Sequence, residues 1–164
     1  MSRLYDFTDY DKYFSLKVSA ELWFIILYLL RPYLALIGSR GAGDGGASLS
    51  SAKGIRNILY PDDFSLVLAL LATAPVLLFM FVWSRRKPDA GELVKKLWHK
   101  GATLLVVAAV LNIVIVFIPL LTGIVARIHA LGWVQVCMAV AIIVYLFSSR
   151  RVRDTFADFP VEKA

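Results

Sequence analysis

The chain has 164 residues, of which 59% are hydrophobic, and it carries a formal net charge of +6. Soluble domains are closer to half apolar, and here the apolar residues form long uninterrupted blocks, so the composition argues against a soluble domain. The cationic residues lie beside these blocks, which favours contact with the lipid bilayer and anionic lipid headgroups over nucleic acid. The single cysteine, Cys137, excludes an intrachain disulfide.

Residues 1–15 mix aromatic and acidic side chains and are predicted to form a cytoplasmic interfacial leader, or alternatively a docking segment for a partner. The acidic start does not resemble a signal peptide, so we expect the first apolar block to be retained. That block, residues 16–37, would measure about 33 Å as a helix, enough to cross a bilayer. It contains Glu21, Arg31 and Pro32, which a simple anchor would not need.

Residues 38–63 are rich in glycine and serine and are predicted to form a periplasmic loop. Gly41 to Ser48 nearly fits a phosphate-binding loop, but Ala47 stands where that motif needs lysine. No cofactor is therefore expected. The second span is predicted over 64–83, with Asp62 and Asp63 at its start and a kink near Thr73.

Residues 84–101 form a basic cytoplasmic loop with a short amphipathic helix expected to lie on the membrane. The third span is predicted over 102–121 with Asn112 at its middle, and the fourth over 128–147 with Gln135 inside it, joined by residues 122–127. Residues 148–164 form a basic tail with a second candidate interfacial helix. The membrane-surface cations are Arg85, Arg86, Lys87, Lys95, Lys96, Arg150, Arg151 and Arg153.

The distribution of lysine and arginine predicts the orientation of the spans. The N-terminal segment through Lys17, the loop between spans two and three, and the tail hold 13 of the 18 cations. The positive-inside rule then places both termini in the cytoplasm. This agrees with an even number of spans, which requires both termini on the same side.

The polar residues within the spans are the candidate pairing residues. Arg31 is expected to snorkel outward or to pair with Asp62 or Asp63, which would make Arg31–Pro32 a hinge and latch between the first two spans. Glu21 lies too far along the helix to reach Arg31, and it is expected to pair with Lys17, Arg85 or Lys100.

Asn112 is expected to bridge to Thr73 or Gln135 through hydrogen bonds. The alternative is that these three residues and Arg31 line a polar path or a lipid-headgroup site.

Catalytic chemistry has few candidates in this sequence. The two histidines, His99 and His129, are predicted at opposite faces of the membrane and cannot share a metal. An outer-face triad around His129 would rest on serines of the glycine-rich loop, which offers little rigid support. We therefore expect no catalytic, cofactor-binding or metal-ligating residue and no enzymatic activity.

Several short motifs resemble a family of uncharacterised bacterial four-span inner-membrane proteins catalogued as a domain of unknown function. The motifs are Leu16-Lys17, Leu22-Trp23, Tyr28 to Pro32, Tyr60-Pro61 with Phe64, and Leu97-Trp98. The resemblance covers most of residues 10–125 and leaves the glycine-rich loop and the tail unmatched. It implies a bacterial inner membrane and supplies no activity.

The sequence thus predicts an all-α, multi-pass, four-transmembrane-helix bundle with short cytoplasmic amphipathic helices. The expected function is a non-enzymatic accessory or scaffold subunit of a membrane complex, in contact with other membrane proteins or with copies of itself. The alternative is a small transporter or channel component, and a weaker alternative is a lipid-directed enzyme.

Overall fold

The computed structural model describes residues 9–10, 15–40, 60, 63–123, 127–128 and 130–160. The all-α prediction is confirmed, because the described residues form helices and contain no strand beyond one isolated bridge between Tyr10 and Leu16. The helices are α1 (Ala20–Leu29), α2 (Arg31–Arg40), α4 (Asp63–Ala72), α5 (Ala74–Ser84), α6 (Glu92–His99), α7 (Gly101–Leu121), α8 (Ala130–Ser148) and α9 (Arg150–Ala157).

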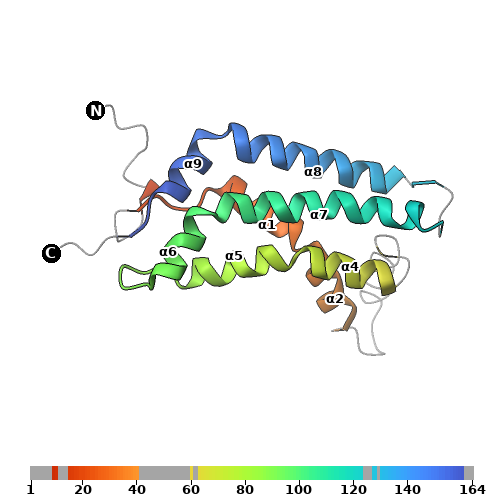
Figure 1. Ribbon diagram of the computed structural model, residues 1–164, viewed down its shortest axis with the longest axis horizontal. Coiled ribbons are helices and arrows are strands. Elements are labelled where there is room, and N and C mark those ends of the chain that lie inside the picture. The colour runs from red at the N-terminus through yellow and green to blue at the C-terminus, as the bar shows by residue number, and fades with distance from the viewer. Residues whose placement is uncertain are drawn as a thin grey trace.

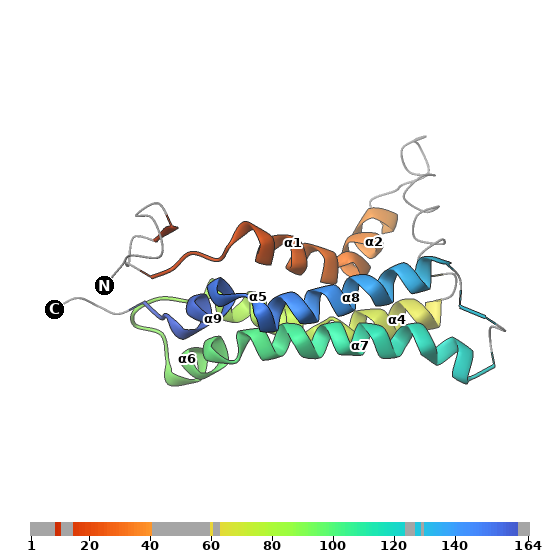
Figure 2. The ribbon, with the colours of Figure 1, turned by 90° about the horizontal axis from the view of Figure 1, so that it is seen from above.

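Helix α7 is the centre of an elongated bundle (Figure 1). Helix α8 runs back along it, while α4 and α5 follow each other along another side of α7. Seen from above, α1 and α2 lie along one side of the other long helices (Figure 2). The short helices α6 and α9 pack together at one end of the bundle, and α2 packs on α4 at the other.

Two helices, α7 and α8, are each long and apolar enough to cross a membrane. Two helix pairs also pass this test when each is joined across its break: α1 with α2, bent by 59°, and α4 with α5, bent by 40°. The described residues therefore contain two spans by length and composition, or up to four if each bent pair is one span.

The outer surface of the bundle is apolar. Only 17% of the most apolar stretch of α8 is buried inside the protein, and large side chains such as Phe147 and Trp133 are more than half exposed. A soluble protein rarely leaves so continuous an apolar surface in water. The helices are therefore compatible with a membrane protein, in which hydrocarbon covers these faces.

Small residues let the helices approach closely at the centre. Ala108 and Ala109 on α7 are completely buried, in the same core as Leu22 of α1 and Val76 of α5. A Cβ atom on Gly132 of α8 would lie 3.2 Å from the Val116 side chain on α7. Close backbone approach is the usual basis of helix packing in a membrane, because dispersion contacts replace the hydrophobic effect there.

The two short helices predicted to be amphipathic are present as α6 and α9, but their apolar residues are used differently from the prediction. The helix in residues 84–101 was expected to lie with its apolar face on the membrane, yet Trp98, which belongs to that face, is fully buried in protein. Its ring stacks on Phe79 at 5.9 Å and contacts Phe156 of α9 at 5.3 Å between centroids. The prediction was wrong for this residue because helical periodicity identifies an apolar face but not what covers it. Leu93, by contrast, is 75% exposed.

Candidate functional site

The break between α1 and α2 positions the most unusual residue of the bundle, Arg31. Pro32 has no N–H to donate to the carbonyl of Tyr28 four residues earlier, so the regular helix cannot continue through this point. The chain turns at Leu30, and α2 restarts at Arg31 with a 59° change of direction. This turn lets the arginine side chain reach residues beyond its own helix.

Arg31 joins three parts of the chain. Its Nε donates to the Tyr60 hydroxyl at 3.3 Å, and a terminal guanidinium nitrogen donates to the Asn112 side-chain oxygen at 3.2 Å. The guanidinium also lies over the Tyr28 ring, 4.5 Å from its centroid. Tyr60 precedes α4 and Asn112 lies on α7, so one side chain links α2 to both. These four residues are called the Arg31 cluster below.

The partners of Arg31 are themselves fixed. Asn112 is 6% exposed and donates from its amide nitrogen to the Ala108 carbonyl at 3.0 Å, which turns its oxygen toward Arg31. Tyr60 is also 6% exposed. Burial is the largest influence on the pKa of Tyr60 and raises it, while the charge of Arg31 opposes the shift. The phenol is therefore neutral at physiological pH, and the cluster carries the positive charge of Arg31.

The break between α4 and α5 also combines a proline with hydrogen bonds from side chains to backbone carbonyls. The 40° bend at this break confirms the predicted kink. The Thr73 hydroxyl donates to the Ala69 carbonyl at 2.6 Å, and this carbonyl also accepts from the Thr73 amide at 3.2 Å. Pro75 follows two residues later and cannot donate to the carbonyl of Leu71. Tyr33 of α2 donates to the Leu70 carbonyl at 3.0 Å. The two bent pairs are thus hydrogen-bonded to each other close to their breaks, where backbone groups need partners.

The predicted partners of the embedded polar residues differ from the observed ones. Arg31 bonds to Tyr60 and Asn112 rather than to Asp63, which is exposed at the start of α4, and Asp62 lies outside the described residues. Glu21 accepts from the Tyr145 hydroxyl of α8, not from Lys17, Arg85 or Lys100.

Asn112 meets Arg31 rather than Thr73 or Gln135. Gln135 is half-buried on α8, and no side-chain hydrogen bond is found for it within the described residues.

Tyrosines are the residues that sequence reasoning missed. Tyr28, Tyr60 and Tyr145 each contact a charged side chain, although they were read only as apolar or interfacial residues. A signal was present, because Tyr60 ends the loop between the first two predicted spans, and Arg31 was expected to reach outward toward that loop. A phenol hydroxyl can accept a hydrogen bond at less desolvation cost than a carboxylate.

A second polar cluster lies at the α6–α9 end and ties the two ends of the chain together. Arg86 lies over the Trp98 ring at 4.2 Å, and its terminal nitrogens donate to the carbonyls of Leu16 and Asp158 at 3.2 and 3.1 Å. The Trp98 indole donates to the Asp158 carbonyl at 2.9 Å, and the Asp158 carboxylate accepts from the Leu16 amide at 2.7 Å. These four residues are called the end cap.

The cations predicted to lie on the membrane surface therefore divide into two groups. Arg86 and Arg151 are half-buried and make contacts within the protein, since Arg86 belongs to the end cap and Arg151 pairs with Asp9 at 2.6 Å. The other six are exposed. Among them, Arg85 and Lys95 lie near aromatic rings, and Lys96 pairs with Glu92 of its own helix. The six are Arg85, Lys87, Lys95, Lys96, Arg150 and Arg153.

Acid–base and metal chemistry have little support in the described part of the chain. No group of three or more histidine, cysteine, aspartate or glutamate side chains there could hold a metal ion. His99 is exposed and its Nδ1 lies 2.7 Å from the Lys95 carbonyl of its own helix. His129 lies outside the described residues. What the geometry does offer is one charged side chain held at a helix break and an aromatic cap at the opposite end.

Comparison with known proteins identifies the family and goes no further. No curated protein and no solved structure matches the chain. A family model does match, over residues 5–158, and so covers α8 and all of α9, which the sequence motifs alone did not reach. The chain belongs to the family described as "Protein of unknown function (DUF2919)", which confirms the resemblance to a domain of unknown function.

Proposed function

We propose that the chain is a four-span protein of the bacterial inner membrane with both termini in the cytoplasm, and that it acts as a non-enzymatic scaffold or accessory subunit of a membrane complex. In this proposal each bent helix pair is one span. The hydrogen bond from Tyr33 of α2 to the Leu70 carbonyl of α4 supports this reading, because it joins the two pairs close to their breaks, where the helical hydrogen-bond pattern is interrupted.

The charges at the ends of the bundle support the orientation. The basic residues of the α5–α6 connection, α6 and α9 gather at one end (Figure 1). Asp9 and Asp158 lie at the same end, as their contacts with Arg151 and Leu16 require. An excess of lysine and arginine is typical of the cytoplasmic side of a membrane protein.

The observation that carries the scaffold proposal is the use of the polar side chains inside the bundle. Arg31 of α2 bonds to the Asn112 side chain of α7 and to the Tyr60 hydroxyl before α4, and so it holds these segments together. Thr73 and the Asn112 amide nitrogen bond to carbonyls of their own helices. Helix α8, in contrast, packs mainly on α7 and leaves an apolar face uncovered by this chain. The polar interior stabilises the bundle, and the apolar exterior is available to other membrane helices.

Site-specific photo-crosslinking in native membranes tests this proposal. A crosslinking residue at Val144 of α8, which is 57% exposed, is expected to give one protein adduct of defined mass that also co-purifies in mild detergent at fixed stoichiometry. The same residue at Ile142, which is 5% exposed, should crosslink only within the chain. The adduct mass distinguishes a second copy of the chain from another protein. Lipid adducts alone would contradict the scaffold proposal.

A second candidate function, a small transporter or channel component, is favoured by one observation. Two broken helix pairs lie side by side, with α2 packed on α4 and the Arg31 cluster between them. Discontinuous helices of this kind form substrate sites in many transporters. The purified protein in liposomes would then show solute flux that is lost in Arg31→Ala and Asn112→Ala. Unchanged flux in both variants would exclude this function.

A further inference from the structure

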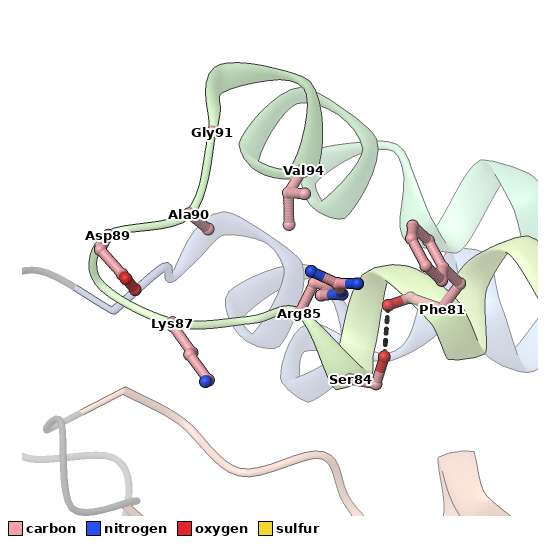
Figure 3. Close-up of a pocket in the computed structure, with 8 residues that line it drawn as sticks. All are labelled: Phe81, Ser84, Arg85, Lys87, Asp89, Ala90, Gly91 and Val94. Atoms are coloured by element: carbon pink, nitrogen blue, oxygen red, sulfur yellow. Dashed lines mark hydrogen bonds between the residues drawn. The ribbon is translucent and has the colours of Figure 1, made fainter.

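A pocket of about 550 Å³ lies between the end of α5 and the start of α6 (Figure 3). Its lining is both apolar and charged, and the residues that matter here are Phe81, Ser84, Arg85, Lys87, Asp89 and Val94. The Arg85 guanidinium extends into the space between the two helices toward Val94, while Lys87 leaves the loop on the other side (Figure 3). Arg85 is thus the cation placed to meet a ligand in the pocket.

Arg85 differs from two other arginines at this end of the bundle in its hydrogen bonds to the protein. Arg86 and Arg151 both form hydrogen bonds to protein oxygens. Within the described residues Arg85 makes neither a hydrogen bond nor an ion pair, and its one contact is with the Phe81 ring, 5.5 Å from the centroid. All five of its N–H donors are therefore free, in a planar arrangement that suits two oxygens of a phosphate.

The rim opposite Arg85 also favours an anion. Ala90 and Gly91 line the pocket where α6 begins. Gly91 is the N-cap and has no side chain to accept from the first amides of the eight-residue helix. The Val94 amide donates to the Gly91 carbonyl at 3.0 Å, so the amides of Glu92 and Leu93 are the ones that can attract negative charge here. The carboxylates of Asp89 and Glu92 oppose an anion, and the attraction therefore rests on Arg85.

Helix α5 orients the ligand through a stripe of residues four apart. Leu77, Phe81 and Arg85 follow one another along one face, with Leu77 42% and Phe81 55% exposed. Residues at this spacing lie above one another on a helix. The stripe therefore runs from aliphatic to aromatic to cationic, in the order of an acyl chain, a glycerol region and a phosphate.

We infer that this pocket binds the phosphate of an anionic phospholipid, with Arg85 on the phosphate oxygens and the acyl chains along Leu77 and Phe81. A soluble phosphate ester shares the headgroup chemistry but would leave the apolar half of the stripe uncovered. The inference rests on the proposed membrane placement of α5 and is independent of the scaffold role.

The test uses the full-length protein in neutral detergent, titrated with phosphatidylglycerol and read by native mass spectrometry. Arg85→Gln is expected to weaken binding by about tenfold to a hundredfold, because hydrogen bonds to a charged group are lost. Arg85→Lys should lose less, since the charge remains but the planar pair of donors does not. Asp89→Asn should strengthen binding by up to about fivefold.

Arg150→Gln is the matched control, since it removes one exposed cation at the same end of the bundle and should leave binding unchanged. Phosphatidylcholine should bind weakly, and glycerol phosphate or inorganic phosphate should not compete at equal concentration. An equal loss of phosphatidylglycerol affinity in Arg85→Gln and Arg150→Gln would overturn the inference, because it would show that the lipid is attracted by the overall positive charge and not by this pocket. Equal binding of soluble phosphate would overturn the lipid assignment. Both results are obtained on isolated protein and leave the scaffold proposal unaffected.

Discussion

Arg31 is tolerated in the bundle because its guanidinium has polar and aromatic partners on three sides of the chain's fold: Tyr60, Asn112 and Tyr28. A free arginine at the centre of a membrane helix costs about 2.5–3.5 kcal/mol on insertion scales. Here a phenol, an amide oxygen and an aromatic face surround the guanidinium. Arg31 and Asn112 are therefore expected to be energetically coupled, so that the effect of replacing one on the free energy of unfolding depends on whether the other is present.

A double-mutant cycle measures this coupling. Asn112→Leu should destabilise the protein, since it leaves a guanidinium donor unpaired, whereas Arg31→Met should relieve part of that cost. We expect a coupling free energy of about 0.6–1.7 kcal/mol, the range found for hydrogen bonds between membrane helices. Unfolding in detergent micelles provides the measurement. The control pair is Arg31 with Gln135, which should be additive, and additivity in both cycles would contradict the assignment.

Gly101, the first residue of α7, has a space requirement that can be tested directly. An added Cβ would overlap the Phe156 ring, which cannot move freely because it packs on Trp98 and Phe79. Gly101→Ala should therefore cost about 1–3 kcal/mol in thermal unfolding, typical of overpacking. Gly91→Ala is the control, since a Cβ there meets nothing within 4 Å. Equal stability of the two variants would show that α9 does not pack here.

At the scale of elements, the end cap makes α6 and α9 parts of one folded unit. Trp98 contributes aromatic packing and also an indole hydrogen bond to the Asp158 carbonyl. Replacing Trp98 would remove the aromatic packing and the hydrogen bond from the α9 segment, and it would also remove the ring that lies against Arg86.

We therefore expect Trp98→Ala to lower the free energy of unfolding by about 3–5 kcal/mol, as for other buried aromatic truncations. The freed tail should be cut sooner in limited proteolysis, with cleavage after Arg150 or Arg153. Leu93→Ala, on the exposed side of the same helix, should leave the cleavage rate unchanged. If the tail of Trp98→Ala resists protease as the native tail does, the end cap is not what holds α9.

Sequence reasoning reached the helical class and the break at Thr73 because hydropathy and proline placement are local properties. It did not reach the Arg31 partners, since these depend on the 59° turn at Leu30, which brings the side chain toward Tyr60 and Asn112. Nor could it place Trp98, because the spacing of apolar residues is the same whether a helix face packs on lipid or on a neighbouring helix. Tertiary contacts between distant segments were the part that local pattern could not supply.

At the scale of the whole molecule, the central claim is that each bent pair crosses the membrane. Cysteine accessibility tests it in a Cys137→Ser background, with single cysteines at Gly38, Thr122, Lys96 and Ala157 and a membrane-impermeant maleimide. All four positions are exposed in the protein. We expect Gly38 and Thr122 to be labelled from outside intact cells or spheroplasts, and Lys96 and Ala157 only after permeabilisation. Outside labelling at Thr122 with Gly38 protected would contradict the claim, because α1 and α2 would then return to the side they came from.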